Sequence, residues 1–238
     1  DVYKRQVDIP TDVAIHAVLH KVAAKENIGY IFNGHCFRTE GIAPLDWTYM
    51  DGRYIASVQK KFGRMPLKDF HNFYLKDFVY YSFIKKVKVV PLLNFMTYRH
   101  AEVGPLLEKE LGWTYYGGHH HESYYTRFIQ SYLLPKKFNL DRRRTELSAL
   151  IRSGQKTRAE AVEYLANQAY EYDEQLIQYA ANKLGFSAAE FKDIIALPPK
   201  SFRDYPTYYP LIRALSWPIQ LAARMGILPR LLYLKFLG

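Results

Sequence analysis

The chain has 238 residues, of which 49% are hydrophobic and 24% are charged, so it is long enough to fold as one large domain, or as one domain with a helical appendage. This composition excludes a disordered chain, and the single cysteine excludes an internal disulfide or a multi-cysteine metal site within these residues, which fits a reducing compartment. The formal net charge of +10 favours an anionic partner, such as a phosphorylated substrate, nucleic acid or a membrane surface, without choosing among them.

The first six residues contain no initiating Met, no helix cap and no hydrophobic period. We interpret residues 1–6 as a non-native or disordered start, and we expect an upstream part of the natural protein to be missing.

A helix is predicted from Thr11 or Asp12, as its N-cap, to about Lys25. Its expected apolar face is made of Val13, Ala17, Val18 and Val22. His16 and His20 share another face, but the helix offers no further metal ligand, so we expect two solvated histidines.

The apolar residues 28–33 predict a buried parallel strand after this helix, and this alternation of helix and strand indicates an α/β fold. The strand ends in a polar loop, residues 34–41. In open α/β sheets ligands bind beyond the carboxyl ends of the strands, and Gly34 would let a ligand approach the backbone. The loop is a candidate site, although an ordinary polar turn explains it equally well.

Residues 42–64 predict an irregular loop with a β-turn at Asp51-Gly52, which either shapes a binding site or caps the core. A helix is predicted at residues 67–85 and a second strand at residues 87–93, where Pro91 indicates a sheet margin.

A helix is predicted at residues 99–111, and a second polar loop, residues 112–123, follows it. Gly117 and Gly118 free its backbone, and Ser123 opens a helix at residues 124–133, whose N-terminal NH groups favour an anion. Residues 119–121 are adjacent histidines, which point apart, so no metal site is expected here. The loop either contacts phosphate or sugar, or is merely solvated.

Five basic side chains lie between residues 136 and 144. Arginine forks suit bidentate phosphate contacts, so this segment predicts a phosphate clamp. A solvated run of charges is the alternative.

Five stretches of the sequence together resemble a known family. They are residues 34–41, 112–123, 128–130, 134–138 and 141–151. Each alone is weak, but their combination, within residues 8–205, resembles the N-acetyl sugar amidotransferases, the WbpG type of bacterial lipopolysaccharide O-antigen biosynthesis. The resemblance implies a partial α/β domain with the Rossmann-like adenine nucleotide α-hydrolase fold of the PP-loop ATP pyrophosphatases, followed by a helical region.

The resemblance also implies a reaction. ATP, with Mg²⁺, would adenylylate the oxygen of an acetamido group on a nucleotide-linked N-acetyl sugar. Ammonia from a separate glutaminase subunit would then displace AMP and leave an acetamidino group. No nucleic acid partner is expected.

The residues to which the resemblance assigns roles lie in the two loops and the basic segment. The expected catalytic residues are Arg38, Glu40, His120 and Glu122. The expected nucleotide-binding residues are Gly34, His35, Thr39, Gly117, Gly118, Ser123, Lys136, Arg142 and Arg143, and no residue is assigned to a metal.

Two features depart from the family pattern. The Ser-Gly-Gly-x-Asp-Ser loop that would cradle pyrophosphate is not among these residues, so we expect this fragment alone to be inactive. Position 119, where the family has lysine, is histidine, which removes a fixed positive charge.

The remaining sequence predicts helices. Thr157 with Glu160, and Ser187 with Glu190, have the spacing of capping boxes for helices at 158–170 and 188–196, and a third helix is predicted at 173–184. The tail, residues 206–238, is basic, hydrophobic and interrupted by prolines. Its charges disfavour a transmembrane span, and it fits either an interfacial helix or an amphipathic cap on the core.

The predicted organisation is thus a start at residues 1–6, a partial α/β domain at 7–155, a helical subdomain at 156–205 and the tail. The expected location is the cytoplasm, extending to the inner face of the membrane. Two alternatives stay open: a PP-loop tRNA-modifying enzyme, which would explain the basic charge, and a non-enzymatic membrane-surface or assembly module, which would explain the tail.

Overall fold

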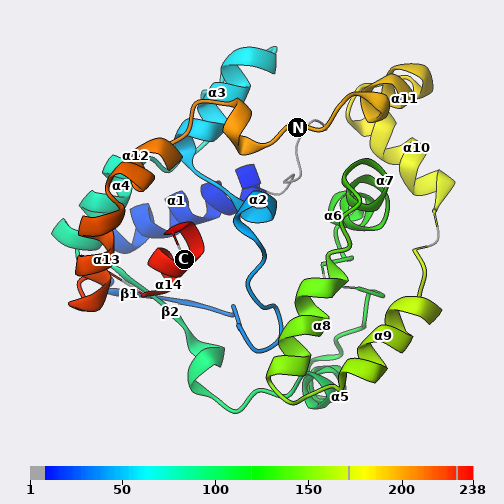
Figure 1. Ribbon diagram of the computed structural model, residues 1–238, viewed down its shortest axis with the longest axis horizontal. Coiled ribbons are helices and arrows are strands. Elements are labelled where there is room, and N and C mark those ends of the chain that lie inside the picture. Colours follow the sequence, from blue (N-terminus) through cyan, green and yellow to red (C-terminus); the bar gives the residue numbers. More distant parts are fainter. Residues whose placement is uncertain (1–8, 119, 171, 229, 238) are drawn as a thin grey trace.

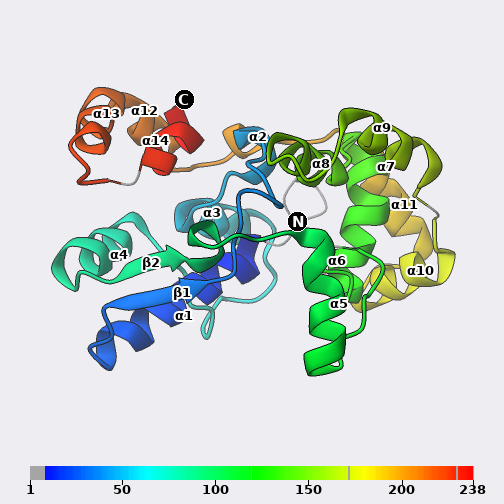
Figure 2. The same cartoon turned by 90° about the horizontal axis from the view of Figure 1, so that it is seen from below.

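The computed structural model describes residues 9–118, 120–170, 172–228 and 230–237, and its elements form two groups, each around its own hydrophobic cluster (Figures 1 and 2). Residues 1–6, for which a non-native start is predicted, and His119 lie outside the described residues.

The first group combines a parallel strand pair with helices from both ends of the chain. Its elements are α1 (Ile9–Lys25), β1 (Tyr30–Asn33), α2 (Leu45–Thr48), α3 (Gly52–Phe62), α4 (Leu75–Val79), the π-helix η1 (Tyr80–Ile84), β2 (Lys88–Pro91), the 3₁₀ helices η2 (Leu92–Phe95) and η4 (Phe202–Asp204), α12 (Tyr209–Ala214), α13 (Ser216–Arg224) and α14 (Arg230–Leu237). Its core is a cluster of Ile9, Val13, Tyr49, Tyr54, Ile55, Val58, Phe202 and Tyr205.

The second group is helical. Its elements are α5 (His100–Leu111), α6 (Tyr124–Phe128), the π-helix η3 (Ile129–Leu133), α7 (Leu134–Phe138), α8 (Arg143–Arg152), α9 (Arg158–Asn167), α10 (Glu174–Lys183) and α11 (Ala188–Ala196). The cluster in its core joins residues 128–138 to residues 176–191, on both sides of the domain boundary predicted at 155.

The helix expected near Thr11 is α1, but its buried face differs from the prediction. Ile9, Val13 and Ala17 are buried, whereas Val18 and Val22 are exposed. The chain is already helical at Ile9, so the residues predicted as N-caps lie inside the helix. The buried face begins earlier than predicted, at Ile9, because the first cluster lies against the start of the helix, and it continues past Ala17 to Ala23.

His20 contradicts the prediction of two solvated histidines. Its side chain is buried, its ring centroid lies 5.1 Å from that of Phe73, and its Nδ1 is 2.7 Å from the carbonyl oxygen of His16. The aromatic segment before α4 covers this face of α1, which the periodicity of α1 alone could not indicate.

The turn predicted at Asp51-Gly52 is instead the start of α3. The Asp51 carboxylate accepts a hydrogen bond from the backbone NH of Tyr54 at 2.6 Å, which makes Asp51 the N-cap. Tyr54, Ile55 and Val58 then face the core at helical spacing. The prediction of an irregular loop was therefore wrong for most of residues 42–64.

The helix predicted at residues 67–85 begins only at Leu75. The Asn72 side chain donates to the carbonyl of Gly52 at 2.8 Å, which holds this segment against α3, and the Asp77 carboxylate accepts from the NH of Tyr74 at 2.8 Å, which starts α4. Side-chain contacts of the polar residues thus override the apolar pattern before residue 75.

Strands β1 and β2 are parallel, with Tyr30 opposite Lys88 and Asn33 opposite Pro91. Pro91 ends β2, as predicted. Tyr30 and Phe32 are 57% and 65% exposed, however, so the prediction of a buried strand was wrong. The described sheet has only two strands, and α1 packs on β1 from one side (Figure 2). The PP-loop architecture itself stays a prediction.

The other predicted helices are present. α5 ends at Gly112, which has the left-handed φ of 64°. Both capping boxes form, at the starts of α9 and α11. None of the helices within the described ranges combines the length and the apolarity needed to cross a bilayer.

Candidate functional site

The loop at residues 34–41 lies at the carboxyl ends of both strands, as predicted. It follows β1 directly, and the NH of Phe37 donates to the side chain of Asn94, just beyond β2, at 3.0 Å. The Arg38 guanidinium donates to the backbone carbonyls of Leu93, Asn94 and Met96 at 3.2 to 3.4 Å. Arg38 thus ties the two strand exits together.

Glu40 closes this loop on itself. Its carboxylate accepts from the NH of Cys36 at 2.9 Å and lies 2.7 Å from Nδ1 of His35. Gly41 then approaches α8 with a left-handed φ of 71°. The loop is therefore fixed both internally and against the second group.

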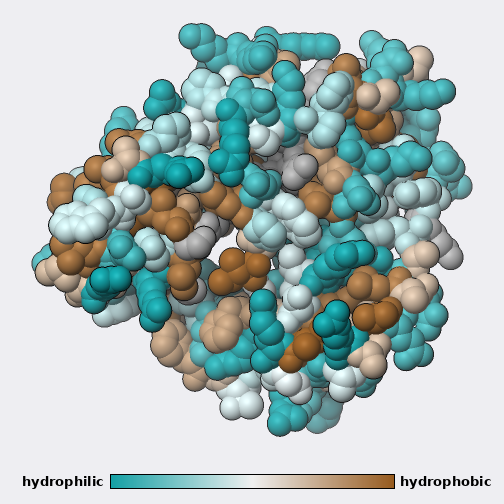
Figure 3. Space-filling view, in the orientation of Figure 1, coloured by the Kyte–Doolittle hydropathy of each residue, from teal (hydrophilic) through white to brown (hydrophobic). Residues whose placement is uncertain are grey.

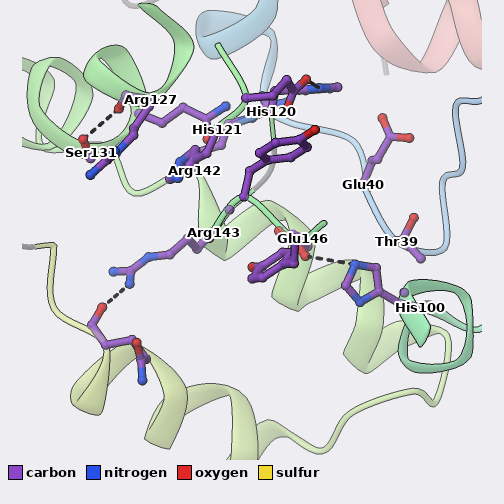
Figure 4. A pocket seen from close by; sticks show the side chains of 18 of the residues that line it. Thr39, Glu40, His100, His120, His121, Arg127, Ser131, Arg142, Arg143 and Glu146 are labelled. Atoms are coloured by element: carbon purple, nitrogen blue, oxygen red, sulfur yellow. Dashed lines mark hydrogen bonds and ion pairs between the residues drawn. The ribbon is translucent and has the colours of Figure 1, made fainter. Parts of the chain in front are cut away.

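A pocket of about 1360 Å³ lies between this loop and the second group (Figure 4). Thr39 and Glu40 line it from the first loop, and Gly117, Gly118, His120 and Glu122 from the second. About 80 residues separate the two loops in the sequence, so the pocket unites the two sites that the sequence predicts independently.

The second loop is shaped by its glycines and histidines. Gly117 has a φ of 83° and His120 a φ of 60°, both in the left-handed region. Nδ1 of His120 lies 3.2 Å from the carboxylate of Glu122. The Ser123 hydroxyl accepts from the NH of Thr126 at 3.2 Å, so Ser123 is the N-cap of α6.

Arg143 forms one wall of the pocket through a bidentate ion pair. Its Nε and Nη2 lie 2.9 and 2.7 Å from the two carboxylate oxygens of Asp141, and its guanidinium lies 4.0 Å from the ring centroid of Tyr170. Its Nη1 donates to the backbone carbonyl of Gln168, which also lines the pocket. Burial opposes the charged form of Asp141, but Arg143 outweighs it, so the pKa of that carboxyl is lowered.

Glu146 points into the pocket (Figure 4), and no sequence pattern had singled it out. Burial raises the pKa of its carboxyl, an effect opposed by His100 and Arg142 and reinforced by Glu40. Its Oε1 lies 4.0 Å from Nε2 of His100, and the two side chains point toward each other (Figure 4). A carboxyl whose pKa is raised by its position in a pocket is a candidate proton donor or acceptor.

Three cationic or titratable groups border the same space. Arg142 lies at the start of α8, and Arg127 on α6 pairs with Asp173 at 3.2 Å. Burial lowers the pKa of His121, and the charge of Arg127 acts in the same direction. His121 is thus favoured in its neutral form, which leaves the arginines as the fixed positive charges of this wall.

Several predicted site residues lie elsewhere. Gly34, His35, Ser123 and Lys136 do not line the pocket, and Arg38 lines a neighbouring one. Within the basic segment, Lys137 donates to three carbonyls at the end of α11, whereas Lys136 is exposed. Of that segment, only Arg142 and Arg143 reach the pocket.

The described residues contain no group of three or more His, Cys, Asp or Glu side chains arranged as a metal site. Three of the carboxylates that line the pocket, Glu40, Glu122 and Glu146, stand on three different segments.

Residues 122–218 match the model of a family described as LPS biosynthesis protein WbpG-like, C-terminal domain. Comparisons with curated proteins and with solved structures gave no match. The matched region starts in the second loop and includes Arg142, Arg143 and Glu146. This part of the chain is therefore similar to the C-terminal domain of WbpG-like proteins of lipopolysaccharide biosynthesis.

Proposed function

We propose that the chain is part of an ATP-dependent amidotransferase that converts the acetamido group of a nucleotide-linked sugar to an acetamidino group. The observation that carries the proposal is the single pocket lined by both predicted loops and by Arg142 and Glu146. The similarity of residues 122–218 to WbpG-like proteins supports it.

The reaction has two steps. The acetamido oxygen bonds to the α-phosphorus of ATP as pyrophosphate leaves, and ammonia then adds to the acetamido carbon as AMP leaves. ATP supplies the activation that lets a poor electrophile react with ammonia. Both substrates carry phosphates, so the pocket needs fixed cations and hydrogen-bond donors.

We assign the phosphate contact to Arg142, because the donors of Arg143 already contact Asp141 and Gln168. Glu40 and Glu122 would orient sugar hydroxyls or meet Mg²⁺ carried on the phosphates, since Mg²⁺ sites commonly combine phosphates with one or two carboxylates. Glu146, beside His100, would accept a proton from the nitrogen as it adds.

The first test is binding. Calorimetric titration of the chain with UDP-N-acetylglucosamine and with ATP should give binding that Arg142→Gln weakens about tenfold or more, because a hydrogen bond to a charged group contributes about 1.5–3 kcal/mol. Arg158→Gln, on the exposed start of α9, is the matched control. If neither compound binds, or if Arg142→Gln binds both as tightly as the control, the assignment of the pocket is wrong.

The second test is the reaction in a protein that also carries the pyrophosphate-binding loop. With ¹⁵N-ammonium as donor, Glu146→Gln should slow incorporation of ¹⁵N into the amidine more than it slows pyrophosphate release. Loss of only glutamine-supported turnover, with ammonium still used at the full rate, would instead place Glu146 at the contact with the glutaminase.

A further inference from the structure

The outer side of α13 carries an apolar stripe. Trp217, Leu221 and Met225 are spaced four residues apart, so they share one side of the helix, and they are 70%, 44% and 65% exposed. We call these three residues the α13 stripe. Figure 3 shows apolar side chains gathered over the part of the molecule where Figure 1 places α12–α14.

The opposite side of the tail is packed on the protein. Tyr209 and Phe236 lie against the first cluster, each with its ring centroid 5.9 Å from that of Tyr49. Gln220 donates to the Tyr233 hydroxyl at 3.1 Å, which joins α13 to α14. The tail therefore caps the core with one side and presents the stripe on the other.

The charged residues of the tail that carries the stripe have one sign. Residues 205–238 contain Arg213, Arg224, Arg230 and Lys235, and no Asp or Glu. Arg224 lies three residues after Leu221 and beside Met225, at the edge of the stripe, and its side chain is exposed. Exposed apolar side chains bordered by cations match the acyl chains and the anionic headgroups of a lipid surface.

We propose that the α13 stripe docks this protein on an anionic lipid membrane. Trp217, the most exposed residue of the stripe, enters the interface, where indole rings are favoured, and Leu221 and Met225 follow it. Arg224 contacts the lipid phosphates. The attachment is reversible, because a short apolar stripe gives marginal affinity unless anionic lipid adds to it.

Vesicle co-sedimentation of the full chain tests the proposal. The chain should bind vesicles of phosphatidylcholine mixed with phosphatidylglycerol and stay in solution with phosphatidylcholine alone. Arg224→Gln should weaken binding about fivefold at low salt, and the double variant Trp217→Ser, Met225→Ser about tenfold or more. Val162→Ser and Arg158→Gln, at exposed positions of α9, are the matched controls and should bind as the parent does.

A second readout follows the stripe directly. In a chain with Trp47 and Trp113 replaced by phenylalanine, brominated lipid should quench Trp217. The proposal is overturned if the chain does not bind the mixed vesicles. It is also overturned if the stripe variant, Trp217→Ser with Met225→Ser, binds them as well as Val162→Ser does. A dimer that the stripe variant dissociates, without vesicle binding, would assign the surface to a second copy of the chain.

Discussion

Gly41 lies so close to α8 that a Cβ atom there would come within 2.8 Å of the carbonyl oxygen of Thr145. Its φ of 71° is also a backbone angle that residues with a side chain rarely adopt. The absence of a side chain at Gly41 thus lets the first loop lie close to the segment of α8 that carries Glu146, so the shape of the pocket depends on the glycine.

We expect Gly41→Ala to lower the free energy of unfolding by about 1–3 kcal/mol, because it adds both backbone strain and a contact with Thr145. Urea unfolding would measure the change. Gly104→Ala is the matched control, since Gly104 lies within α5 with nothing within 4 Å of its added Cβ. That variant should be neutral or more stable by up to about 1 kcal/mol. Equal stability of the two variants would contradict the close contact.

Sequence patterns predicted the helices whose signals are local. Thr157 and Ser187 cap α9 and α11 through residues three positions ahead, so each cap can be read within one turn. The prediction of a turn at Asp51-Gly52 was wrong because the Asp-Gly pair suits both a turn and a helix start. Which of the two forms depends on the packing of Tyr54 against Tyr205, which is far away in the sequence.

The candidate site was predictable only in part for the same reason. The polar loops stood out as motifs, but the pKa of Glu146 is raised by burial among other chain segments and, to a smaller extent, by the charge of Glu40. The roles of Arg38 and Lys137 as donors to backbone carbonyls likewise depend on chain segments about 55–60 residues away. Neither the pKa nor the carbonyl contacts have a sequence signature.

Lys137 should stabilise the fold, whereas Lys136 should not. The Lys137 ammonium donates to the carbonyls of Ile194, Ile195 and Leu197 at 2.7 to 3.1 Å, which ties α7 to the end of α11. Lys137→Met should therefore lower the unfolding free energy by about 1–3 kcal/mol. Lys136→Met, its exposed neighbour, should change it by less than about 0.5 kcal/mol. Thermal and urea unfolding would compare the two variants. Equal losses of stability would reject the role of Lys137 in joining α7 to α11.

The Asp141–Arg143 pair should make stability depend on pH. The pKa of Asp141 is lowered in the folded protein, so its stabilisation is present above the ordinary value of 3.8 and is lost as the pH falls through the folded pKa. Asp141→Asn should cost about 1–3 kcal/mol at neutral pH, since both side chains are about one-fifth exposed. The difference in unfolding free energy between this variant and the parent should disappear as the pH falls into the acidic range. Asp193→Asn, at an exposed position of α11, is the control and should show no such convergence.

Glu146 should have the opposite effect on stability. Because its pKa is raised on folding, the folded chain binds more protons than the unfolded chain above the ordinary value of 4.5. Its contribution to stability therefore falls as the pH rises from 4.5 through the raised pKa. Glu146→Gln should flatten this part of the melting temperature profile. An unchanged profile would mean that the carboxyl is already ionised throughout that range.

Arg142 and Arg143 are adjacent in sequence but should have different roles. We expect Arg142 to contact the ligand and Arg143 to stabilise the fold. The guanidinium of Arg143 is held by Asp141, Gln168 and the ring of Tyr170, whereas among the described residues the side chain of Arg142 makes no hydrogen bond. Arg143→Gln should lower the unfolding free energy by about 1–3 kcal/mol, because it leaves the Asp141 carboxylate without its main partner. Arg142→Gln should leave the melting temperature near that of the parent and weaken binding of UDP-N-acetylglucosamine about tenfold or more. Calorimetry and thermal unfolding on the same two variants measure both quantities. Full stability of Arg143→Gln together with lost affinity would transfer the phosphate contact to Arg143 and refute the division between the two.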